Sequence, residues 1–325
     1  MAVRVRPALE RQGAPECMVC PTDGRRLVLD LDSCDAAAAG AAGAWPVRGP
    51  PTRSFSFDSV HDRAATQADI FHGCGMPEML DAALDGYTAT VFAYGQTGSG
   101  KTYTVSGPPA SRTTSSTSHM PGLSAPLPES SGLMQRTAYY LYEQMARRPG
   151  VQFTVRATYL EIYNEQVVDL IEPGAPLPVR GSVATGFYVE DLSVVMCRGL
   201  KDLQYVMAKG LEHRHRRVHQ LNSDSSRSHS IFSIYIDAVD DDGSASSASP
   251  QSLAAPGAPA GAQRYGRISI LDLAGSENVR TSQSQGAGLK EAGSINKSLF
   301  ALGQVIKALA QAVATDGRKS KCAPP

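Results

Sequence analysis

The sequence predicts an α/β fold in which helices cover both faces of a central, mixed and mostly parallel sheet. Short apolar or alternating stretches, typical of strands, are separated by stretches whose apolar residues recur at helical spacing. This alternation of β and α elements is the main support for a sheet between helical layers. With 325 residues, 42% of them hydrophobic, the chain can bury a sizeable core.

The strand predictions come from four stretches of the chain. Residues 90–94 form a short apolar run, and residues 151–159 place alternate apolar side chains on one face. Residues 232–238 alternate in the same way. Residues 268–273 form a nearly continuous apolar run. Both of these last stretches are expected to be partly buried strands.

The helix predictions come from apolar residues at helical spacing within residues 134–145, 203–210 and 295–309. The last set steps by four, three, four and three along Ile295, Leu299, Leu302, Ile306 and Leu309. Because this set covers only about two heptads, we expect it to pack on a sheet rather than to form a coiled coil.

Compositionally biased stretches at residues 36–51, 107–131 and 240–263 interrupt these elements. They lack the apolar periodicity that would offset the entropy of ordering them, so each is expected to be a surface loop. They interrupt one domain rather than separate several. The Ser- and Thr-rich stretch at 107–131 suits either a phosphorylated regulatory loop or a tolerated insertion, and we favour the insertion.

The charge balance bears on partners and location. Lys plus Arg equals Asp plus Glu, at 31 each, so no global field draws the chain to nucleic acid, and no nucleic-acid partner is expected. No apolar run approaches the ~20 residues that span a bilayer, and the first residues lack the apolar core of a signal peptide. We expect an intracellular protein without a membrane span.

A glycine-rich motif follows the first predicted strand and consists of Gly95, Gln96, Thr97, Gly98, Ser99, Gly100, Lys101 and Thr102. It matches the G-x-x-x-x-G-K-[ST] phosphate-binding pattern. Glycines let successive backbone N–H groups turn toward phosphates without a clash at Cβ. Lys101 would neutralise phosphate charge, and the Thr102 hydroxyl would be a ligand of Mg²⁺, which prefers oxygen. The motif predicts a nucleoside triphosphate site.

A second motif, Asp272-Leu273-Ala274-Gly275, ends the apolar stretch that begins at residue 268. A carboxylate there can hold Mg²⁺ through water, and the Gly275 N–H can contact a γ-phosphate. Alone the D-x-x-G pattern is weak. Two strand ends that carry phosphate-site residues nevertheless suit neighbouring strands that open into one crevice.

A polar run at residues 222–229, with sequence NSDSSRSH, lies between a predicted helix and a predicted strand. Its hydroxyls, amide and guanidinium suit a segment that closes over a γ-phosphate. An ordinary helix-to-strand turn would favour the same residue types. The residues alone support these two interpretations equally.

Taken in this order, GQTGSGKT, NSDSSRSH and LDLAGSE resemble the phosphate loop, switch I and switch II of the kinesin motor domain. The likeness extends from VRVRP near the start to SINKSLFALGQVIKAL, which ends at Leu309. The segments GLMQRT and GFYVEDL are most similar to the kinesin-twelve-like subgroup. The resemblance therefore implies a P-loop NTPase of the kinesin motor fold.

The resemblance also implies a domain layout. After Leu309 the family continues with a Tyr-Arg-Asp-Ser-Lys-Leu-Thr-like motif, another helix, a final strand and helix, and the neck, which this sequence does not show. We therefore expect residues 1–310 to be a motor domain that lacks its last strand and helices. Residues 311–325 are expected to be an atypical polar tail.

Carried over by position, the resemblance implies roles for residues that bind ATP and Mg²⁺. The adenine would be framed by Arg4, Pro7 and Tyr103. The phosphates would be wrapped by residues 95–102. Ser226 and Thr102 would be ligands of Mg²⁺, with Asp272 holding it through water.

The remaining implied roles concern the switches. The γ-phosphate would be bound with the help of Asn222 and Ser225, and Gly275 would sense it. Arg227 and Glu277 would form an ion pair that closes only when both switch segments close.

The implied function is an ATP-dependent microtubule motor with microtubule-stimulated ATPase activity in the cytoplasm and cytoskeleton. Its partner would be tubulin, and it could form a homodimer through sequence not present here. The helix within 295–309 would face the microtubule, with Lys290 and Lys297 near its start. The basic run at 213–217 is instead expected to be a solvated helix end.

Two alternatives stay open at this point. A kinesin-fold protein could bind microtubules without motility because of the missing end. A guanine-nucleotide switch would share the phosphate loop and D-x-x-G, but it needs an Asn-Lys-x-Asp motif, whereas Asn296-Lys297-Ser298 is followed by Leu299. ATP is therefore favoured.

Overall fold

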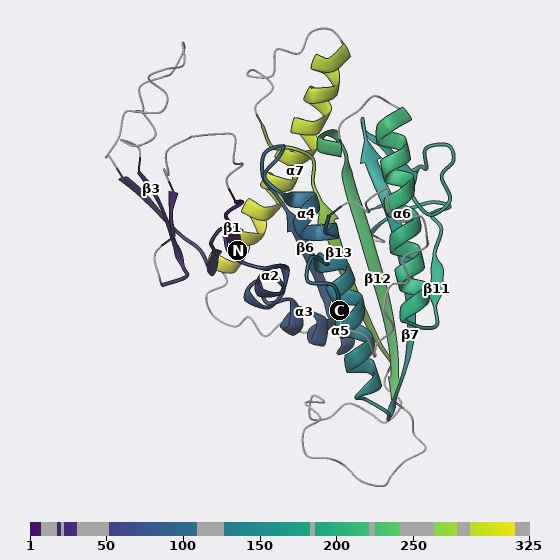
Figure 1. Cartoon of the computed structure of the whole chain (residues 1–325). Coiled ribbons are helices and arrows are strands. Elements are labelled where there is room, and N and C mark those ends of the chain that lie inside the picture. The colour runs from purple at the N-terminus through teal and green to yellow at the C-terminus, as the bar shows by residue number, and fades with distance from the viewer. Residues whose placement is uncertain are drawn as a thin grey trace. The chain divides into compact units, whose positions relative to one another are not determined.

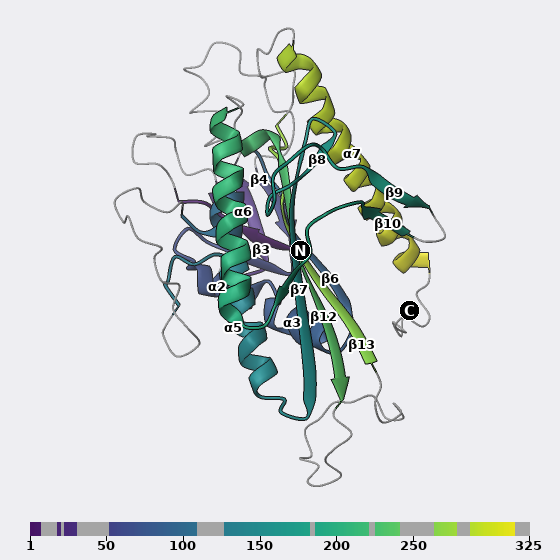
Figure 2. The same ribbon diagram turned by 90° about the vertical axis from the view of Figure 1, so that its right-hand side faces the viewer.

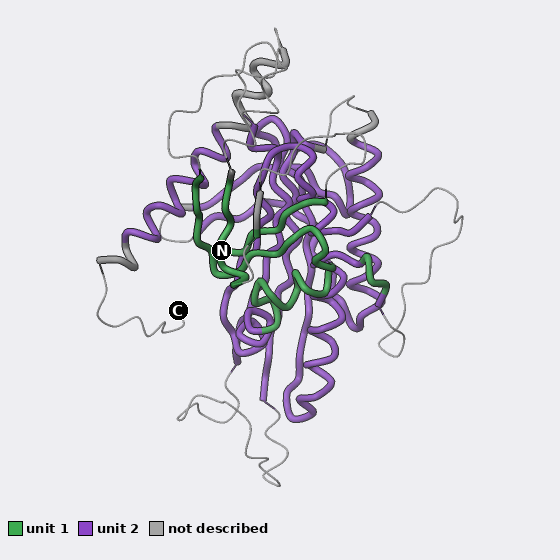
Figure 3. The backbone as a smooth tube through the Cα atoms, turned by 60° about the vertical axis from the view of Figure 1, so that its left-hand side comes forward, with its two compact units in different colours: residues 1–77, 128–130 green, residues 78–127, 131–325 purple. Residues whose placement is uncertain are grey.

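The computed structural model describes residues 1–7, 18–20, 23–30, 52–108, 127–182, 186–220, 225–240, 263–277 and 287–315 (Figure 1, turned by 90° in Figure 2). The chain divides into two compact units, shown in separate colours in Figure 3. The first consists of residues 1–77 and 128–130, and the second of residues 78–127 and 131–325. The expected boundary of the motor domain at residue 310 stays a prediction.

The strands in the described part of the first unit are short. They form a parallel pair, β1 (Ala2–Arg4) with β5 (Ser59–His61), and an antiparallel sheet in the order β2 (Met18–Val19), β3 (Arg26–Asp30) and β4 (Thr52–Ser56). Helix α2 (Gln67–Gly73) follows a capping box: the Thr66 hydroxyl accepts a hydrogen bond from the Asp69 N–H, and the Asp69 carboxylate accepts one from the Thr66 N–H. Such reciprocal bonds satisfy N–H groups that the first helical turn leaves free.

The second unit is built around a six-stranded sheet in the order β11-β7-β12-β13-β6, with β8 beside β7. Its strands are β6 (Thr88–Ala93), β7 (Val151–Tyr163), β8 (Gln166–Asp169), β11 (Val195–Cys197), β12 (His229–Asp240) and β13 (Gln263–Asp272). The strands β9 (Val179–Ser182) and β10 (Gly186–Val189) pair separately as an antiparallel ribbon.

The second unit contains the helices α4 (Lys101–Ser106), α5 (Leu133–Ala146), α6 (Leu200–Gln220) and α7 (Ala287–Thr315), with a 3₁₀ turn η1 (Ser225–Arg227). Helix α3 (Met76–Leu84) begins in the last two residues of the first unit and continues in the second. Figure 2 shows α5 and α6 on one side of the sheet and α7 on the other. The predicted α/β architecture with helices on both faces is therefore confirmed.

Strand direction differs from the prediction. Strand β12 runs antiparallel to both β7 and β13, and β11 and β8 run antiparallel to β7. Among the described strands of this sheet, β6 and β13 form the parallel pair. The sheet is mixed, as expected, but mostly antiparallel where it is described. Apolar periodicity reports which side chains are buried and carries no information about the direction of a neighbouring strand.

The core confirms the strand and helix patterns read from the sequence. The alternating residues Phe232, Ile234 and Ile236 on β12 are at most 1% exposed. Tyr159 on β7 packs edge-on against Phe232, with ring centroids 5.4 Å apart. The apolar faces of α5 and α6 are also buried, with Met134, Ala138, Leu141, Leu203, Val206 and Met207 inside.

Helix α7 does not follow its prediction. Ile306 and Leu309, expected to pack on a sheet, are 42% and 63% exposed, and Phe300 is 68% exposed. The expectation is wrong for these side chains because helical spacing identifies an apolar face but not what covers it. Over the described residues, no helix is both long and apolar enough to cross a lipid bilayer.

Gly210 on α6 lies against the Tyr159 ring, and a Cβ built at this glycine falls 2.6 Å from Cε1 of that ring. Tyr159 is 1% exposed and cannot move aside, so Gly210→Ala should destabilise the fold by about 1–3 kcal/mol despite the better helix propensity of alanine. Urea unfolding measures this loss.

The matched control is Gly303→Ala, on exposed α7, where a Cβ meets nothing within 4 Å. This variant should be neutral or more stable by up to about 1 kcal/mol. Equal effects of the two substitutions would show that Gly210 is not needed for the close approach of α6 to β7.

Candidate nucleotide-binding site

The predicted phosphate loop connects the end of β6 to the start of α4. Gly95, Gly98 and Gly100 have φ values of +154°, +77° and +98°. Side chains other than glycine rarely adopt such angles. A turn within the loop is closed by the Ser99 N–H, which donates to the Gln96 carbonyl at 3.1 Å. The glycine positions of the motif therefore match the backbone that they are needed for.

Lys101, the first residue of α4, folds back over this loop. Its ammonium donates to the carbonyl oxygens of Gly95 at 2.8 Å and of Gln96 at 3.0 Å. Burial lowers the pKa of Lys101, whereas the carboxylates of Asp272 and Glu277 act in the opposite direction. The charge is thus held at the mouth of the loop and is only partly compensated by the protein.

Asp272 lies beside the loop because β13 pairs in parallel with β6, so that Asp272 is opposite Ala93. This confirms the prediction that the two motif-bearing strand ends are neighbours. The Thr102 hydroxyl donates to Oδ2 of Asp272 at 2.7 Å. Asp272 is 1% exposed, and its Oδ1 has no hydrogen-bond partner among the described residues. A buried carboxylate oxygen of this kind fits a water held by Mg²⁺.

The predicted switch II segment contacts both switch I and the phosphate loop through backbone hydrogen bonds. The Gly275 N–H donates to the Ser226 carbonyl at 2.6 Å, and the Ser276 N–H donates to the Gly95 carbonyl at 3.1 Å. The structure therefore brings three segments together that lie far apart in the sequence. Asn222 and the Ser225 side chain lie outside the described residues.

Glu277 is engaged by the phosphate loop in this structure. Its carboxylate accepts the Thr97 N–H at 2.9 Å through Oε2 and the Thr97 hydroxyl through Oε1. Burial alone would raise the pKa of Glu277, but these hydrogen bonds, with Lys101 nearby, hold it below its usual value. A Cβ at Gly275 would collide with both Glu277 and Thr97 Oγ1, so this arrangement needs a glycine there.

Comparison with known proteins decides which family carries this geometry. The family model described as kinesin motor domain matches residues 4–324. The chain belongs to the kinesin motor domain family. Mouse KIF12 is 40% identical over 284 residues, which cover 86% of this chain and 41% of that protein. Mouse KIF18B is 35% identical over 98% of this chain and 35% of that protein.

Further similarities agree with the kinesin assignment. The Arabidopsis thaliana kinesin KIN-12C is 36% identical over 80% of this chain and 12% of its own length. The solved structure of a fast kinesin, 30% identical, superposes with a TM-score of 0.73 over 98% of this chain and 76% of that chain. KIF12 and KIN-12C are consistent with the kinesin-twelve-like subgroup. The chain spans less than half the length of these curated relatives.

Sequence reasoning missed a buried ion network in this kinesin motor domain. Arg214 on α6 donates to Asp272 Oδ2 at 2.6 Å and lies 3.9 Å from Glu161 on β7. Arg217 donates to the other oxygen of Glu161 at 2.9 Å. The side chains of Arg214, Asp272 and Glu161 are at most 5% exposed.

The prediction of a solvated helix end at 213–217 is therefore wrong for Arg214 and Arg217, although Arg216 does pair on the surface with Glu212. The missed signal was Glu161, a carboxylate between the apolar residues Leu160 and Ile162 near the end of β7. A buried carboxylate needs a cation nearby, and the densest basic run in the sequence was the obvious source.

Removing Arg214 would take from the buried Asp272 its ion-pair partner at 2.6 Å and would leave the buried Glu161 paired with Arg217 at 2.9 Å. Arg214→Ala should therefore lower the free energy of unfolding by about 3–5 kcal/mol. Arg216→Ala is the matched control on the same helix. The ion pair of Arg216 with Glu212 is more than half exposed, so it should contribute only a few tenths of a kcal/mol to the free energy of unfolding. Urea titration of both variants tests the difference, and similar losses would contradict a structural role for the buried network.

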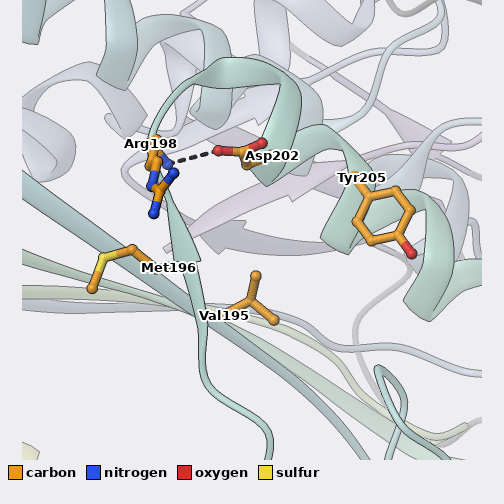
Figure 4. A pocket seen from close by; sticks show the side chains of 5 residues that line it. All are labelled: Val195, Met196, Arg198, Asp202 and Tyr205. Atoms are coloured by element: carbon orange, nitrogen blue, oxygen red, sulfur yellow. Dashed lines mark hydrogen bonds between the residues drawn. The ribbon is translucent and has the colours of Figure 1, made fainter.

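The residues expected to frame the adenine lie in different units. In the first unit, the Arg4 guanidinium donates to Gln67 Oε1 at 2.8 Å, and Pro7 is exposed. In the second, Tyr103 on α4 is 44% exposed. Their adenine-binding role stays a prediction. The pocket in Figure 4, lined by Val195, Met196, Arg198, Asp202 and Tyr205, shares no residue with the predicted nucleotide site.

Proposed function

We propose that this chain is the catalytic motor domain of a kinesin that binds ATP with Mg²⁺, hydrolyses it and moves along microtubules. The observation that carries the proposal is the meeting of three segments at Gly275. Its N–H contacts switch I at Ser226, while the next N–H contacts the phosphate loop at Gly95. Any movement of Gly275 toward a γ-phosphate must change both contacts.

Nucleotide binding in this proposal uses the loop from Gly95 to Thr102 and the charge of Lys101. The residues that fit Mg²⁺ are the Thr102 and Ser226 hydroxyls, with Asp272 acting through water. When bound, the ion would neutralise phosphate charge as the γ-phosphoryl group departs. The chain's own contribution is to hold the Thr102 hydroxyl oxygen 2.7 Å from Oδ2 of Asp272, so that both side chains can face one ion.

Hydrolysis in this proposal also needs the switches to close. Asn222 and Ser225 would bind the γ-phosphate, and Arg227 would pair with Glu277. In the structure the Glu277 carboxylate is bound to Thr97. Closure would therefore require Glu277 to leave or share this partner, which makes the ion pair a readout of the nucleotide state.

Microtubules are the proposed partner, and the cytoplasmic cytoskeleton is the proposed location. Helix α7 presents exposed apolar side chains and Lys297, whose side chain is 76% exposed and whose ammonium lies 3.5 Å from Glu165. An exposed lysine of this kind is available to an acidic surface such as that of tubulin. The solved fast kinesin, studied for its interactions with microtubules, supports the same partner.

The test is phosphate release by the purified chain, with ATP and Mg²⁺, in the presence and absence of microtubules. A motor domain should turn over ATP many times faster when microtubules are present. Unchanged turnover would overturn the motor proposal, and weak co-sedimentation with microtubules would then indicate the non-motile alternative. A preference for GTP in direct competition binding would overturn the choice of nucleotide.

A further inference from the structure

His229, the first residue of β12, lies between switch II and helix α7 and is 7% exposed. Its Nδ1 accepts a hydrogen bond from the Ala274 N–H at 3.0 Å. Its Nε2 lies 2.7 Å from the Ser298 hydroxyl oxygen on α7. One buried ring therefore contacts both the D-x-x-G segment and the helix that follows switch II.

The protonation state of this ring follows from its partners. A backbone N–H only donates, so Nδ1 must be unprotonated and the hydrogen of the neutral ring resides on Nε2, which donates to Ser298. Burial lowers the pKa of His229, and Arg214 lowers it further, while Asp272 and Glu165 act in the opposite direction. The neutral form that the geometry requires is thus the form that the surroundings favour.

The position of Ala274 makes this contact informative. Ala274 directly precedes Gly275, whose N–H meets switch I. Ser298 lies next to Lys297, whose ion pair with Glu165 also ties α7 to the sheet. That pair is exposed at both ends and should be weak, whereas the His229 ring is buried, with a buried hydrogen bond to Ala274 and a partly buried one to Ser298. The histidine is therefore the stronger of these two side-chain ties.

We propose that His229 is a positioning residue that couples the Ala274–Gly275 backbone to Ser298, so that movement of switch II is passed directly to α7. The imidazole is a rigid ring, and its two nitrogens hold the two partners at fixed separation. The coupling to motor activity rests on the proposed function. The mechanical tie, meaning the hydrogen bonds that join His229 to Ala274 and to Ser298, does not depend on that function.

The decisive experiment uses two substitutions that each keep one half of the ring. The side-chain oxygen of His229→Asn can replace Nδ1 but cannot reach Ser298. The longer side chain of His229→Gln can reach Ser298 but places no acceptor at the Nδ1 position. Hydrogen exchange followed by mass spectrometry, on peptides covering 270–277 and 297–311 of the full chain, reports the two contacts separately.

We expect His229→Asn to speed exchange in the α7 peptide by about two- to tenfold and to spare the switch II peptide. His229→Gln should do the reverse. Ser298→Ala, which changes a half-buried side chain on α7, should reproduce the Asn result. The double variant Ser298→Ala with His229→Asn should exchange no faster in the α7 peptide than His229→Asn alone. Identical exchange in wild type and both His229 variants would overturn the proposal, as would equal acceleration of both peptides by each.

A second readout connects the tie to activity. Ser298→Ala should keep its basal ATP turnover but lose several-fold in the stimulation by microtubules. Normal stimulation in Ser298→Ala, with wild-type stimulation intact, would overturn the coupling role. If the wild-type chain shows no stimulation, the proposed function fails instead, and the exchange pattern still decides whether the tie exists.

Discussion

Replacing Lys101 with alanine is expected to abolish tight ATP binding. The Lys101 side chain is half-buried at the loop, where its hydrogen bonds within the described part of the chain go to the carbonyl oxygens of Gly95 and Gln96. A triphosphate would supply the counter-charge that the loop carbonyls cannot. Loss of a partly desolvated charge pair typically costs about 2–5 kcal/mol, so Kd should rise by ~30-fold to ~4,000-fold. Titration with a fluorescent ATP analogue measures this directly.

The matched control is Lys201→Ala on the exposed face of α6, which should leave Kd unchanged. Circular dichroism and urea unfolding of Lys101→Ala separate a binding defect from a folding defect. If Lys101→Ala binds ATP within about threefold of wild type, the phosphate-loop assignment is wrong, because no other part of the motif supplies a full positive charge.

Local patterns were enough to predict the strands that carry the site. Alternation located β12, a continuous apolar run located β13, and the glycines of the loop have the positive φ values that their motif demands. The adjacency of β6 and β13 followed from the chemistry at their ends, because both strand ends carry residues for one phosphate site. Features encoded within about ten neighbouring residues were therefore predictable.

Pairings between distant side chains were not predictable in this way. Arg214 and Asp272 are 58 positions apart, and Thr97 and Glu277 are 180 apart. Nothing in the residues around either partner specifies the other. Sequence reasoning read the basic run as a helix end near solvent, since a charged run on a helix usually is solvated. The burial of Arg214 depends on where α6 docks on β7, which is a property of the whole sheet.

The predictions of strand direction and of the packing of α7 were wrong for a related reason. A side chain's periodicity records that one face is apolar, and this is the same for parallel and antiparallel neighbours. The same pattern on α7 predicted an apolar face, yet Ile306 and Leu309 remain exposed in the described structure. What covers a face is decided by tertiary packing, which a single segment does not contain.

Glu277 binds Thr97 in the structure, whereas the resemblance to kinesins implies a different partner, Arg227. Both oxygens of its carboxylate are bound by Thr97, whereas the family pattern pairs it with Arg227. These arrangements are compatible if they belong to different states of the site. With Thr97 as partner, the carboxylate occupies an N–H of the phosphate loop. With Arg227 as partner, that N–H becomes available to a phosphate, and the two switches are joined.

Glu277→Ala is therefore expected to separate ATP binding from hydrolysis. Removing the carboxylate takes away half of the switch ion pair, so turnover should fall by about 10²–10³-fold, the scale of losing one preorganised electrostatic group. Binding should be preserved or tightened, because the Thr97 N–H loses its internal competitor. Single-turnover phosphate release and fluorescent-nucleotide titration give the two quantities.

Glu277→Gln keeps an acceptor for Thr97 but not the charge, so it should hydrolyse as slowly as Glu277→Ala without binding ATP more tightly. Normal turnover in both variants would remove the ion pair from the mechanism, and weakened binding in Glu277→Ala would show that the Thr97 contact supports the loop rather than competing with phosphate.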